Sequence, residues 1–324
     1  MSQMVNKIKS TNTTGTDNIS SKLVKDQSYL LIPILTHIFN LCIQKNVYPN
    51  NLKIMKIIPV LKPDKDSLDP TSYRDINLSN IFAKIVDRII YNQMMEFLES
   101  NKIFPNTHIG GLPGMSTSDA IEKIHDKLQK SNSQSTPSCF ISIDQKSAFT
   151  MIQHSILLKK LDHIGFSYNS VVFMRSYLIN RSQSTYFNGT YSSISDIGDY
   201  GCFQGLITSS LLYILYVLDQ PMIAHIACDH EKEYDSIDEC EEMFSINYID
   251  DNMTEITTGN WDDIIDKTEI YLKNQQTYHE DNLLSFNHEK TVLLVNSKKK
   301  KYRKKKANFN DKVIEHTEKL KSLV

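Results

Sequence analysis

The feature that most constrains the fold of this chain is residues 243–255, MFSINYIDDNMTE, in which two adjacent carboxylates interrupt an apolar pattern. Apolar residues lead into Tyr248 and Ile249, the carboxylates of Asp250 and Asp251 follow, and the apolar rhythm then resumes. Such alternation predicts a short β-hairpin with the acidic pair at or beside its turn.

Two anionic side chains held together repel each other, so such a pair persists best where a cation neutralises it. Nucleotidyl transfer uses such a place, because two Mg²⁺ ions about 3.5–4 Å apart clamp the attacking and leaving oxygens. The pair alone is weak support, since a second pair, Asp262-Asp263, precedes a helix-like run and is explained there as an N-cap and a first-turn acid. A metal site therefore needs acidic partners from elsewhere in the chain.

The composition is that of a globular protein with room for two or three packed lobes, since the chain has 324 residues and 40% are hydrophobic. No apolar run approaches the length of about 18 residues that spans a bilayer, and the polar N-terminus does not look like a signal peptide. The five cysteines are scattered without C-x-x-C spacing, which argues against a disulfide framework or structural zinc. We therefore expect an intracellular protein, cytoplasmic or nuclear, with no membrane partner.

The net charge is only −2, but the charges are unevenly distributed. Residues 229–242 form an acidic block with one lysine, whereas residues 298–306, KKKKYRKKK, are almost wholly basic. The basic run could follow a phosphate backbone. A nuclear-import patch or a solvated loop explains it equally well.

The N-terminal half is predicted to alternate helices and strands. Predicted helices cover residues 20–44, 81–98 and 117–130, and predicted strands cover residues 53–61 and 72–79. Pro33 predicts a break or kink in the first helix. Ser116, Thr117 and Asp119 are suited to cap the third, which a polar linker at residues 131–138 follows.

The C-terminal half begins with CFISI at residues 139–143, whose continuous apolar run predicts a buried central strand ending on Asp144. Further helices are predicted at 150–164, 170–178, 206–218 and 262–276, a hairpin around Asn188-Gly189, and a strand–turn–strand at 283–295. This is an α+β pattern. Asp144 and the Asp250-Asp251 turn could therefore meet on adjacent strands of one antiparallel sheet and hold two Mg²⁺ through oxygen ligands.

Several short motifs occur in a fixed order along most of the chain. They are Lys62 after the IPVLKP strand, SYRDI at residues 72–76, a glycine-rich stretch at 110–120, DQKSAF at 144–149, SYL at 176–178 with Arg181, Gln204-Gly205, YIDD at 248–251 and NHEKT at 287–291. In this order, from about residue 14 to 295, the chain resembles the reverse transcriptase domain of non-LTR (LINE-like) retrotransposons. Group II intron maturases are similar at a greater distance.

The resemblance implies a polymerase right-hand fold, with an antiparallel sheet packed on helices and the thumb largely absent. Its implied domains are an N-terminal helical extension at 1–50, fingers at 51–137, a palm with the catalytic carboxylates at 138–296, and a basic tail with the start of the primer-grip region at 297–324.

The resemblance also implies roles for single residues. Asp144 and Asp250 would bind two Mg²⁺ ions, or Mn²⁺, with Asp251 as the third acidic member. The implied nucleotide-binding residues are Lys62 and Arg74 for the triphosphate, Phe149 as a steric gate under the sugar, Gln204 and Gly205 in the template and nucleotide pocket, and Lys290 at the leaving pyrophosphate. Phe149 also fits as plain core, and Arg74 and Lys290 also fit as ordinary surface cations.

The implied function is RNA-directed DNA polymerisation, the transfer of dNMP from dNTPs to a DNA primer on an RNA template. The chain departs from the family pattern at several positions, namely Asp75, Leu112, Met115, Thr150, Phe203 and Leu206. One alternative is therefore a catalytically inactive, truncated relic that at most binds nucleic acid. Another is an RNA-dependent RNA polymerase, against which bulky Phe149 argues.

Overall fold

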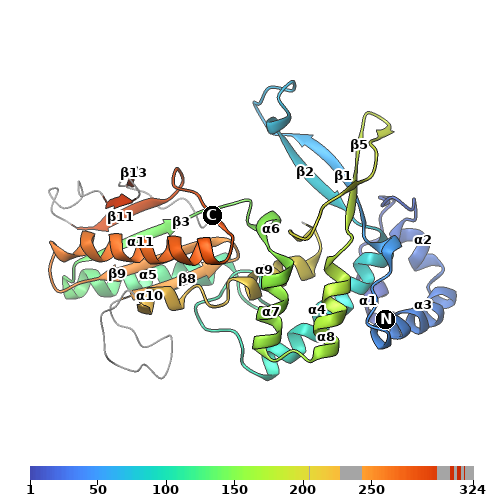
Figure 1. Ribbon diagram of the computed structural model, residues 1–324, viewed down its shortest axis with the longest axis horizontal. Helices are drawn as coiled ribbons and strands as arrows, with labels where there is room; N and C mark the ends of the chain where they lie inside the picture. Colours follow the sequence, from blue (N-terminus) through green and yellow to red (C-terminus); the bar gives the residue numbers. More distant parts are fainter. Residues whose placement is uncertain (204, 227–242, 298–306, 310–311, 315–316, 318–324) are drawn as a thin grey trace. The chain divides into compact units, whose positions relative to one another are not determined.

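The computed structural model of the chain describes residues 1–203, 205–226, 243–297, 307–309, 312–314 and 317 (Figure 1). The chain divides into two compact units, and each unit is built from two separate stretches of sequence. The first unit joins Met1–Asn101 to Ile152–Leu212, and the second joins Lys102–Met151 to Tyr213–Val324. The acidic block at 229–242, the basic run at 298–306 and Gln204 lie outside the described residues.

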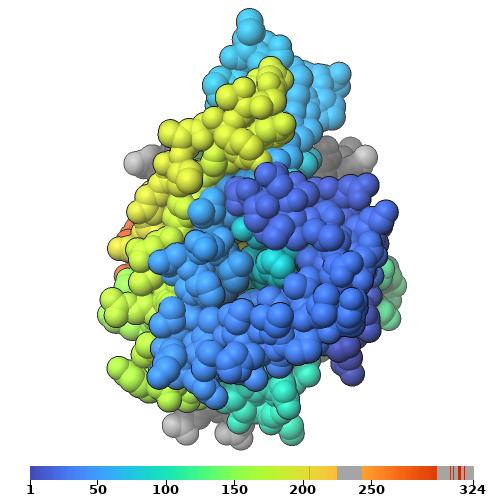
Figure 2. All heavy atoms as spheres, turned by 90° about the vertical axis from the view of Figure 1, so that its right-hand side faces the viewer, coloured from blue at the N-terminus to red at the C-terminus, as the bar shows by residue number. Residues whose placement is uncertain are grey.

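The first unit contains a sheet in which β1 (Ile54–Leu61) lies between β2 (Tyr73–Leu78) and β5 (Ser182–Phe187). β1 is antiparallel to β2 and parallel to β5, and the short strands β6 (Thr190–Tyr191) and β7 (Ser195–Asp196) pair with β5. Asn188 and Gly189 both have positive φ, which a two-residue hairpin turn requires, so the predicted hairpin is confirmed. Figure 2 shows the β1–β2 and β5–β6 hairpins projecting side by side from this unit.

The first unit also contains most of the helices. They are α1 (Ser2–Lys7), α2 (Ser21–Asp26), α3 (Ser28–Gln44), α4 (Ile81–Ser100), α7 (His154–Ile164), α8 (Tyr168–Leu178) and α9 (Ile207–Tyr216), whose last turn belongs to the second unit, with single 3₁₀ turns at Asn50–Leu52 and Pro70–Ser72. Pro33 was predicted to break or kink the first predicted helix; the break is wrong, because Pro33 lies inside α3 and the chain breaks at Gln27 instead. Proline removes one helical hydrogen bond, to the carbonyl of Tyr29, and that residue is exposed to water.

The second unit is organised around a four-stranded antiparallel sheet in the order β11-β3-β9-β8. Its strands are β3 (Ser138–Ile143), β8 (Met243–Tyr248), β9 (Asp251–Thr257) and β11 (Val292–Asn296). All six residues of β3 are buried, so the predicted central strand is confirmed. The prediction that β3 and the acidic hairpin lie on neighbouring antiparallel strands is also confirmed.

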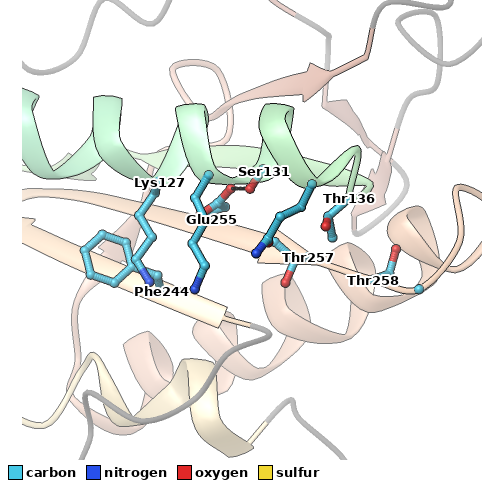
Figure 3. Close-up of a pocket in the computed structure, with 10 residues that line it drawn as sticks. Lys127, Ser131, Thr136, Phe244, Glu255, Thr257 and Thr258 are labelled. Carbon is cyan, nitrogen blue, oxygen red and sulfur yellow. Dashed lines mark hydrogen bonds between the residues drawn. The ribbon is translucent and has the colours of Figure 1, made fainter.

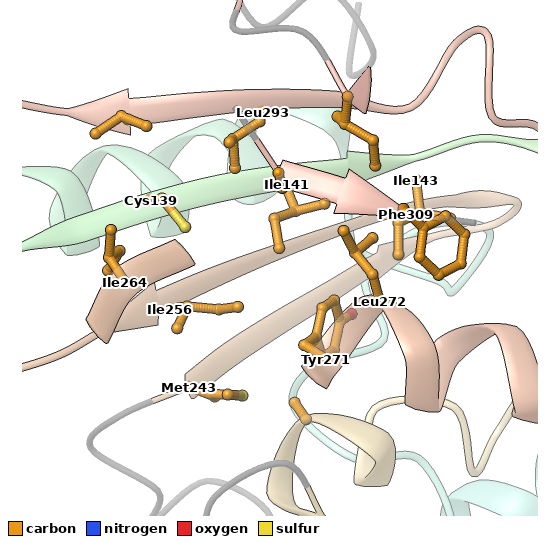
Figure 4. Packing of buried hydrophobic residues seen from close by; sticks show 14 of the residues in the cluster. Cys139, Ile141, Ile143, Met243, Ile256, Ile264, Tyr271, Leu272, Leu293 and Phe309 are labelled. Atoms are coloured by element: carbon orange, nitrogen blue, oxygen red, sulfur yellow. The ribbon is translucent and has the colours of Figure 1, made fainter. Parts of the chain in front are cut away.

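Each face of this sheet packs against a long helix. Alternate side chains of β3 point to opposite faces, as the strand period requires. Ile141 packs with Leu272 of α11 (Asp263–Asp281), as Figure 4 shows, and Phe140 packs toward Leu128 of α5 (Thr117–Gln134) on the other face. The buried residues on the α11 face include Cys139, Ile143, Met243, Ile256, Ile264, Tyr271, Leu293 and Phe309.

One helix predicted in the second half of the chain needs correction. The helix predicted at 150–164 is interrupted, because α6 (Ala148–Met151) ends before α7 begins at His154. The strand–turn–strand predicted at 283–295 is confirmed, but its two strands have different partners, since β10 (Ser285–Phe286) pairs with β4 (Gln145–Lys146) and β11 pairs with β3. Pairing partners depend on the tertiary fold, which local turn signals do not encode.

At the start of α11 the second acidic pair occupies the positions that the sequence predicts, but another residue makes the capping hydrogen bonds. Asp262 occupies the N-cap position but its side chain makes no capping hydrogen bond, and Asp263 lies in the first turn. Asn260 caps instead, because its Oδ1 accepts from the amides of both aspartates. At α5, by contrast, Ser116 and Asp119 form the capping box that the sequence predicts.

The remaining described elements are short. They are α10 (Met222–Ile226) and the strand pair β12 (Ala307–Phe309) and β13 (Lys312–Ile314). Within the described residues, no helix has both the length and the apolar character needed to cross a membrane.

Candidate active site

The predicted acidic hairpin is formed by β8 and β9, and its turn carries the acidic pair. Tyr248 pairs with Asp251, which leaves Ile249 and Asp250 as the two turn residues. Ile249 has a φ of 56°, in the left-handed region that β-branched residues rarely occupy. Such strain persists only where surrounding contacts hold it, and it is concentrated at functional sites.

Strand register brings Asp144 to this turn. In the antiparallel pairing of β3 with β9, Ile143 lies opposite Asn252. Continued by one residue, the register sets Asp144 opposite Asp251, and directly opposed Cα atoms lie about 4.5–5.5 Å apart. Three carboxylates from distant parts of the sequence therefore gather at one end of the sheet.

Asp144 is held in place by two residues of the NHEKT segment. The Nδ2 of Asn287 donates a 2.6 Å hydrogen bond to Oδ2 of Asp144, and the Asn287 amide donates to the Asp144 carbonyl. The Nζ of Lys290 lies 3.4 Å from the same Oδ2. Lys290 was predicted to act at this site from its motif, whereas Asn287 was not singled out, although it starts the same motif.

Burial and mutual repulsion disfavour the charged forms of the two carboxylates at the turn. Burial raises the pKa of Asp250, and the charge of Asp144 raises it further, while Lys290 opposes the shift. Burial, followed by the charges of Asp250 and Asp144, raises the pKa of Asp251 to about 6. Such a group releases its proton most readily when a cation arrives to balance the charge.

The raised pKa of Asp251 predicts a pH-dependent stability. The folded chain binds the Asp251 proton more tightly than the unfolded chain, whose aspartate pKa is 3.8, so this group lowers folding stability as pH rises from about 4 to about 6. In metal-free buffer, Asp251→Asn should therefore be more stable than the wild type at pH 7.5 and indistinguishable from it below about pH 4. Urea unfolding at both pH values measures this. Equal midpoints for the two proteins at pH 7.5 would contradict it.

Two aromatic residues lie beside the carboxylates. Tyr213, in the last turns of α9, is fully buried, and its hydroxyl donates to Oε1 of Gln145, the neighbour of Asp144. Burial, followed by the charge of Asp250, raises the pKa of Tyr213, so the phenol stays neutral. The Phe149 ring is tilted on Tyr213 at a centroid distance of 5.4 Å. Sequence reasoning missed Tyr213, because it lies in an apolar run where a tyrosine gives no separate signal.

The glycine-rich stretch runs directly behind the acidic turn. The Ile109 amide donates to the carbonyl of Asn247 at 3.0 Å, so the chain follows the outer edge of β8. A Cβ on Gly110 would lie 2.4 Å from the Ile249 amide nitrogen and 2.6 Å from the Tyr248 Cα. Real Cβ atoms do not approach backbone that closely, so only glycine fits at position 110.

The other predicted nucleotide-binding residues belong to the first unit. Lys62 and Arg74 lie at the far end of the β1–β2 hairpin, where the Lys62 Nζ donates to the Thr71 carbonyl at 2.8 Å. Gly205 has a φ of 96°, and a Cβ there would lie 3.1 Å from the carbonyl oxygen of Asn77 on β2. Gln204 lies outside the described residues. The structure thus gathers Asp144, Asp250, Asp251, Phe149 and Lys290 in the second unit.

The donor set at the sheet end is chemically suited to a hard divalent cation, because it consists of carboxylate oxygens. Among the residues that the structure describes, however, no three His, Cys, Asp or Glu side chains are arranged as a metal site. Lys290 is the counter-charge at Asp144, at 3.4 Å. The residues therefore fit a metal in donor chemistry but not in the arrangement of their side chains.

A separate polar cavity of about 300 Å³ lies at the opposite end of β9 (Figure 3). It contains Glu255, whose carboxylate accepts a 2.6 Å hydrogen bond from the Ser131 hydroxyl of α5. Lys127 points across it, with Nζ 4.3 Å from the ring centroid of Phe244. Glu255 is four residues from Asp251, about 13 Å along the strand, so this acidic residue is not part of the carboxylate cluster.

A family model and several relatives both match this chain to reverse transcriptases. The family model described as "Reverse transcriptase (RNA-dependent DNA polymerase)" matches residues 60–309. The chain is 26% identical over 207 residues to a probable RNA-directed DNA polymerase from transposon BS of Drosophila melanogaster. It is 27% identical over 226 residues to the RNA-directed DNA polymerase from mobile element jockey of Drosophila funebris. These alignments cover 64% and 68% of this chain but 23% and 24% of the relatives, so the chain spans about a quarter of their length.

Two solved structures share the fold. Apo telomerase from Candida tropicalis, truncated from its C-terminal domain, matches with a TM-score of 0.52 and 12% identity, covering 82% of this chain and 53% of that one. Telomerase from Candida albicans, in complex with a fragment of telomeric RNA, matches with a TM-score of 0.51 and 15% identity, covering 75% and 43%. The predicted α+β right-hand fold is confirmed. Because the family model extends over most of the sequence, this chain belongs to the reverse transcriptase family, as its ordered motifs had indicated.

Proposed function

We propose that this chain is the polymerase domain of a retrotransposon-type element and transfers dNMP to a primer 3′-hydroxyl on an RNA template. The observation that carries the proposal is the register of the second-unit sheet, which pairs Ile143 with Asn252 and so brings the next residue, Asp144, to the turn that holds Asp250. The relatives from transposon BS and jockey are RNA-directed DNA polymerases by name.

In this proposal Asp144, Asp250 and Asp251 hold two Mg²⁺ ions, which Mn²⁺ could replace. Bound metal would supply charge stabilisation at the attacking and leaving oxygens. The protein supplies the placement of the ligands. Asn287 orients Asp144 through its 2.6 Å hydrogen bond, and Lys290, whose side chain is 70% exposed, can turn from Asp144 toward a leaving pyrophosphate.

We further propose that the sheet and carboxylates of residues 138–296 form the palm and that residues 51–137 supply the fingers. The predicted N-terminal extension at 1–50 and tail at 297–324 flank them. Lys62 and Arg74, on the β1–β2 hairpin, would bind the triphosphate as a point charge and as a planar fork. Gly205, with Gln204, would shape the template and nucleotide pocket, since its missing side chain lets this turn approach β2.

A primer-extension assay tests the function directly. An RNA template annealed to a DNA primer is incubated with the protein, dNTPs and Mg²⁺, and EDTA should stop extension. Binding of the template-primer that weakens with salt, without any extension in Mg²⁺ or Mn²⁺, would identify an inactive relic instead. Extension with rNTPs in preference to dNTPs would indicate an RNA polymerase.

Phe149 offers a sharper test of the nucleotide site. Its half-buried ring lies on Tyr213, beside the carboxylates, where a bulky side chain can exclude a ribose 2′-hydroxyl. Phe149→Val should raise the efficiency of rNTP incorporation relative to dNTP by about tenfold or more, since removing one steric contact is worth about 1–3 kcal/mol. Competing dCTP and rCTP in single-nucleotide extension measures the ratio. An unchanged ratio would assign Phe149 to the core alone.

A further inference from the structure

A group of polar side chains is buried beneath the acidic hairpin, on the face of the sheet that packs against α11. We call it the hairpin network; its members are Ser245, Asn247, Asn252, Thr254, Tyr271 and Gln275. Each is at most 4% exposed. Figure 4 shows the Tyr271 ring between α11 and the strands that carry the hairpin.

The Tyr271 hydroxyl is the centre of this network. It lies 2.6 Å from the hydroxyl of Thr254 and 3.2 Å from Oδ1 of Asn252. The Nε2 of Gln275, one helical turn further along α11, donates to the same hydroxyl at 2.9 Å. One phenolic oxygen thus joins α11 to two residues of β9, Asn252 and Thr254, which follow each other on the same face of the strand.

The network continues across the hairpin to β8. Asn252 donates through Nδ2 to Oδ1 of Asn247 and to the Ser245 hydroxyl, and the Thr254 hydroxyl donates to Ser245 at 2.9 Å. Asn247 and Asn252 are directly opposed in the pairing, one step from the Tyr248–Asp251 pair that closes the turn. The polar pairs are therefore the ones nearest the acidic turn.

Gln220, a fully buried residue that follows α9, links the α11 part of the network to β8. Its Nε2 donates to Gln275 at 3.2 Å, and its Oε1 accepts from Nδ2 of Asn247 at 3.4 Å. The backbone of Asn247 is fixed as well, since its amide donates to the Thr107 carbonyl at 2.9 Å. Asn247 is thus held through both its side chain and its backbone.

Burial alone does not explain why these positions carry polar rather than apolar side chains. Farther from the turn, the same face carries the apolar pair Met243 and Ile256, which packs with the α11 core. Buried polar groups are costly unless they are hydrogen-bonded, and these partners are aligned in a single register. A one-residue slip of β8 would turn Ser245 and Asn247 to the α5 face, away from Tyr271 and Gln275.

We infer that the hairpin network is a positioning device, which fixes the register of β8 on β9 and thereby sets the turn residue Asp250 relative to Asp251. The register claim stands on the hydrogen bonds alone. Its consequence for metal binding rests on the proposed function. Tyr271 and its partners touch no reacting atom, so they are positioning residues.

The test compares two isosteric variants that each lose one buried tyrosine hydroxyl. Tyr271→Phe removes the centre of the network. Tyr216→Phe is the matched control, because Tyr216 is also fully buried in the second unit and its hydroxyl donates to the Asn282 carbonyl at 2.5 Å, away from the hairpin. Amide hydrogen exchange of peptides covering residues 244–255 is measured on metal-free protein, and Mn²⁺ affinity is measured by electron paramagnetic resonance.

We expect hairpin amides to exchange about tenfold faster in Tyr271→Phe than in Tyr216→Phe at equal melting temperature. The Mn²⁺ dissociation constant should rise about tenfold in Tyr271→Phe but not in Tyr216→Phe, the lower end of the effect of removing an outer-shell partner. Thr254→Val, which removes the second hydroxyl of the network with little change in shape, should reproduce both changes and serves if Tyr271→Phe does not fold.

Equal hairpin exchange in the Tyr271→Phe, Thr254→Val and Tyr216→Phe proteins would overturn the inference. If hairpin exchange is faster in the network variants but the wild-type protein neither binds Mn²⁺ nor extends a primer, the register claim is supported and the proposed function is rejected. If exchange is unchanged in the network variants but the wild-type protein extends primers, the proposed function is supported and the register claim is rejected.

Discussion

Asp250→Ala is expected to lower primer extension by about 10³-fold or more while leaving the fold intact. Asp250 lies in a two-residue turn, so its side chain is not needed for strand pairing. Its removal takes one ligand from the carboxylate cluster, and metal-bound charge stabilisation is worth several kcal/mol at the transition state. Because burial and Asp144 raise the pKa of Asp250, the variant should also be no less stable than the wild type in metal-free buffer at neutral pH.

The chain contains its own control for this experiment. Asp262-Asp263 is the other Asp-Asp pair of the sequence, in the same unit, and Asp262 is exposed. Asp262→Ala should therefore keep extension within about twofold of the wild type, as surface substitutions usually do. Single-turnover extension under saturating dNTP, with unfolding curves for each protein, separates loss of chemistry from loss of folding. Wild-type rates in Asp250→Ala would refute the proposed two-metal site.

Gly110→Ala is expected to have the second-largest effect, although the change adds a single methyl group. The new Cβ would lie 2.4 Å from the Ile249 amide nitrogen, and backbone cannot rotate away as a side chain can. Overpacking of this kind costs about 3 kcal/mol, the upper end of the usual range. Any relief moves the acidic turn, and a displacement of about 1 Å in a catalytic site can cost about 10²-fold in rate.

Gly259→Ala is the matched control for this substitution. Gly259 is in the same unit, and a Cβ there would meet nothing within 4 Å. Its stability and extension rate should therefore stay close to those of the wild type. Urea unfolding and primer extension on the three proteins give both numbers. If Gly110→Ala and Gly259→Ala had the same stability and the same extension rate, the close approach of Gly110 to the turn would not matter for folding or activity.

Several elements were predictable because their signals are local. The β8–β9 hairpin follows from alternation around an acidic turn, and the Asn188-Gly189 turn follows from the ease with which both residues adopt positive φ. The buried strand β3 follows from a continuous apolar run. Each depends on residues within a few positions of one another.

The features that the sequence did not predict depend on residues that are far apart along the chain. Pro33 was expected to break or kink a helix, yet α3 continues through it, and no sequence signal indicated the partners of β10 and β11, which pair with β4 and β3. Tyr213 carried no signal of its own within an apolar helix, yet it lies against the carboxylate site. These outcomes depend on neighbours that are distant in sequence, and periodicity cannot report them.

The sequence by itself determined the family of this protein and the candidate residues for its proposed chemistry, since the ordered motifs and the acidic residues Asp144, Asp250 and Asp251 are visible without coordinates. Only the tertiary structure decided how those residues are assembled. Both compact units are built from two separate stretches of chain, and Asp144 reaches the acidic turn through the register of β3 on β9. Strand register and contacts such as those of Gly110 with the turn and Tyr271 with Thr254 involve side chains that meet only after folding, so no local pattern contains them.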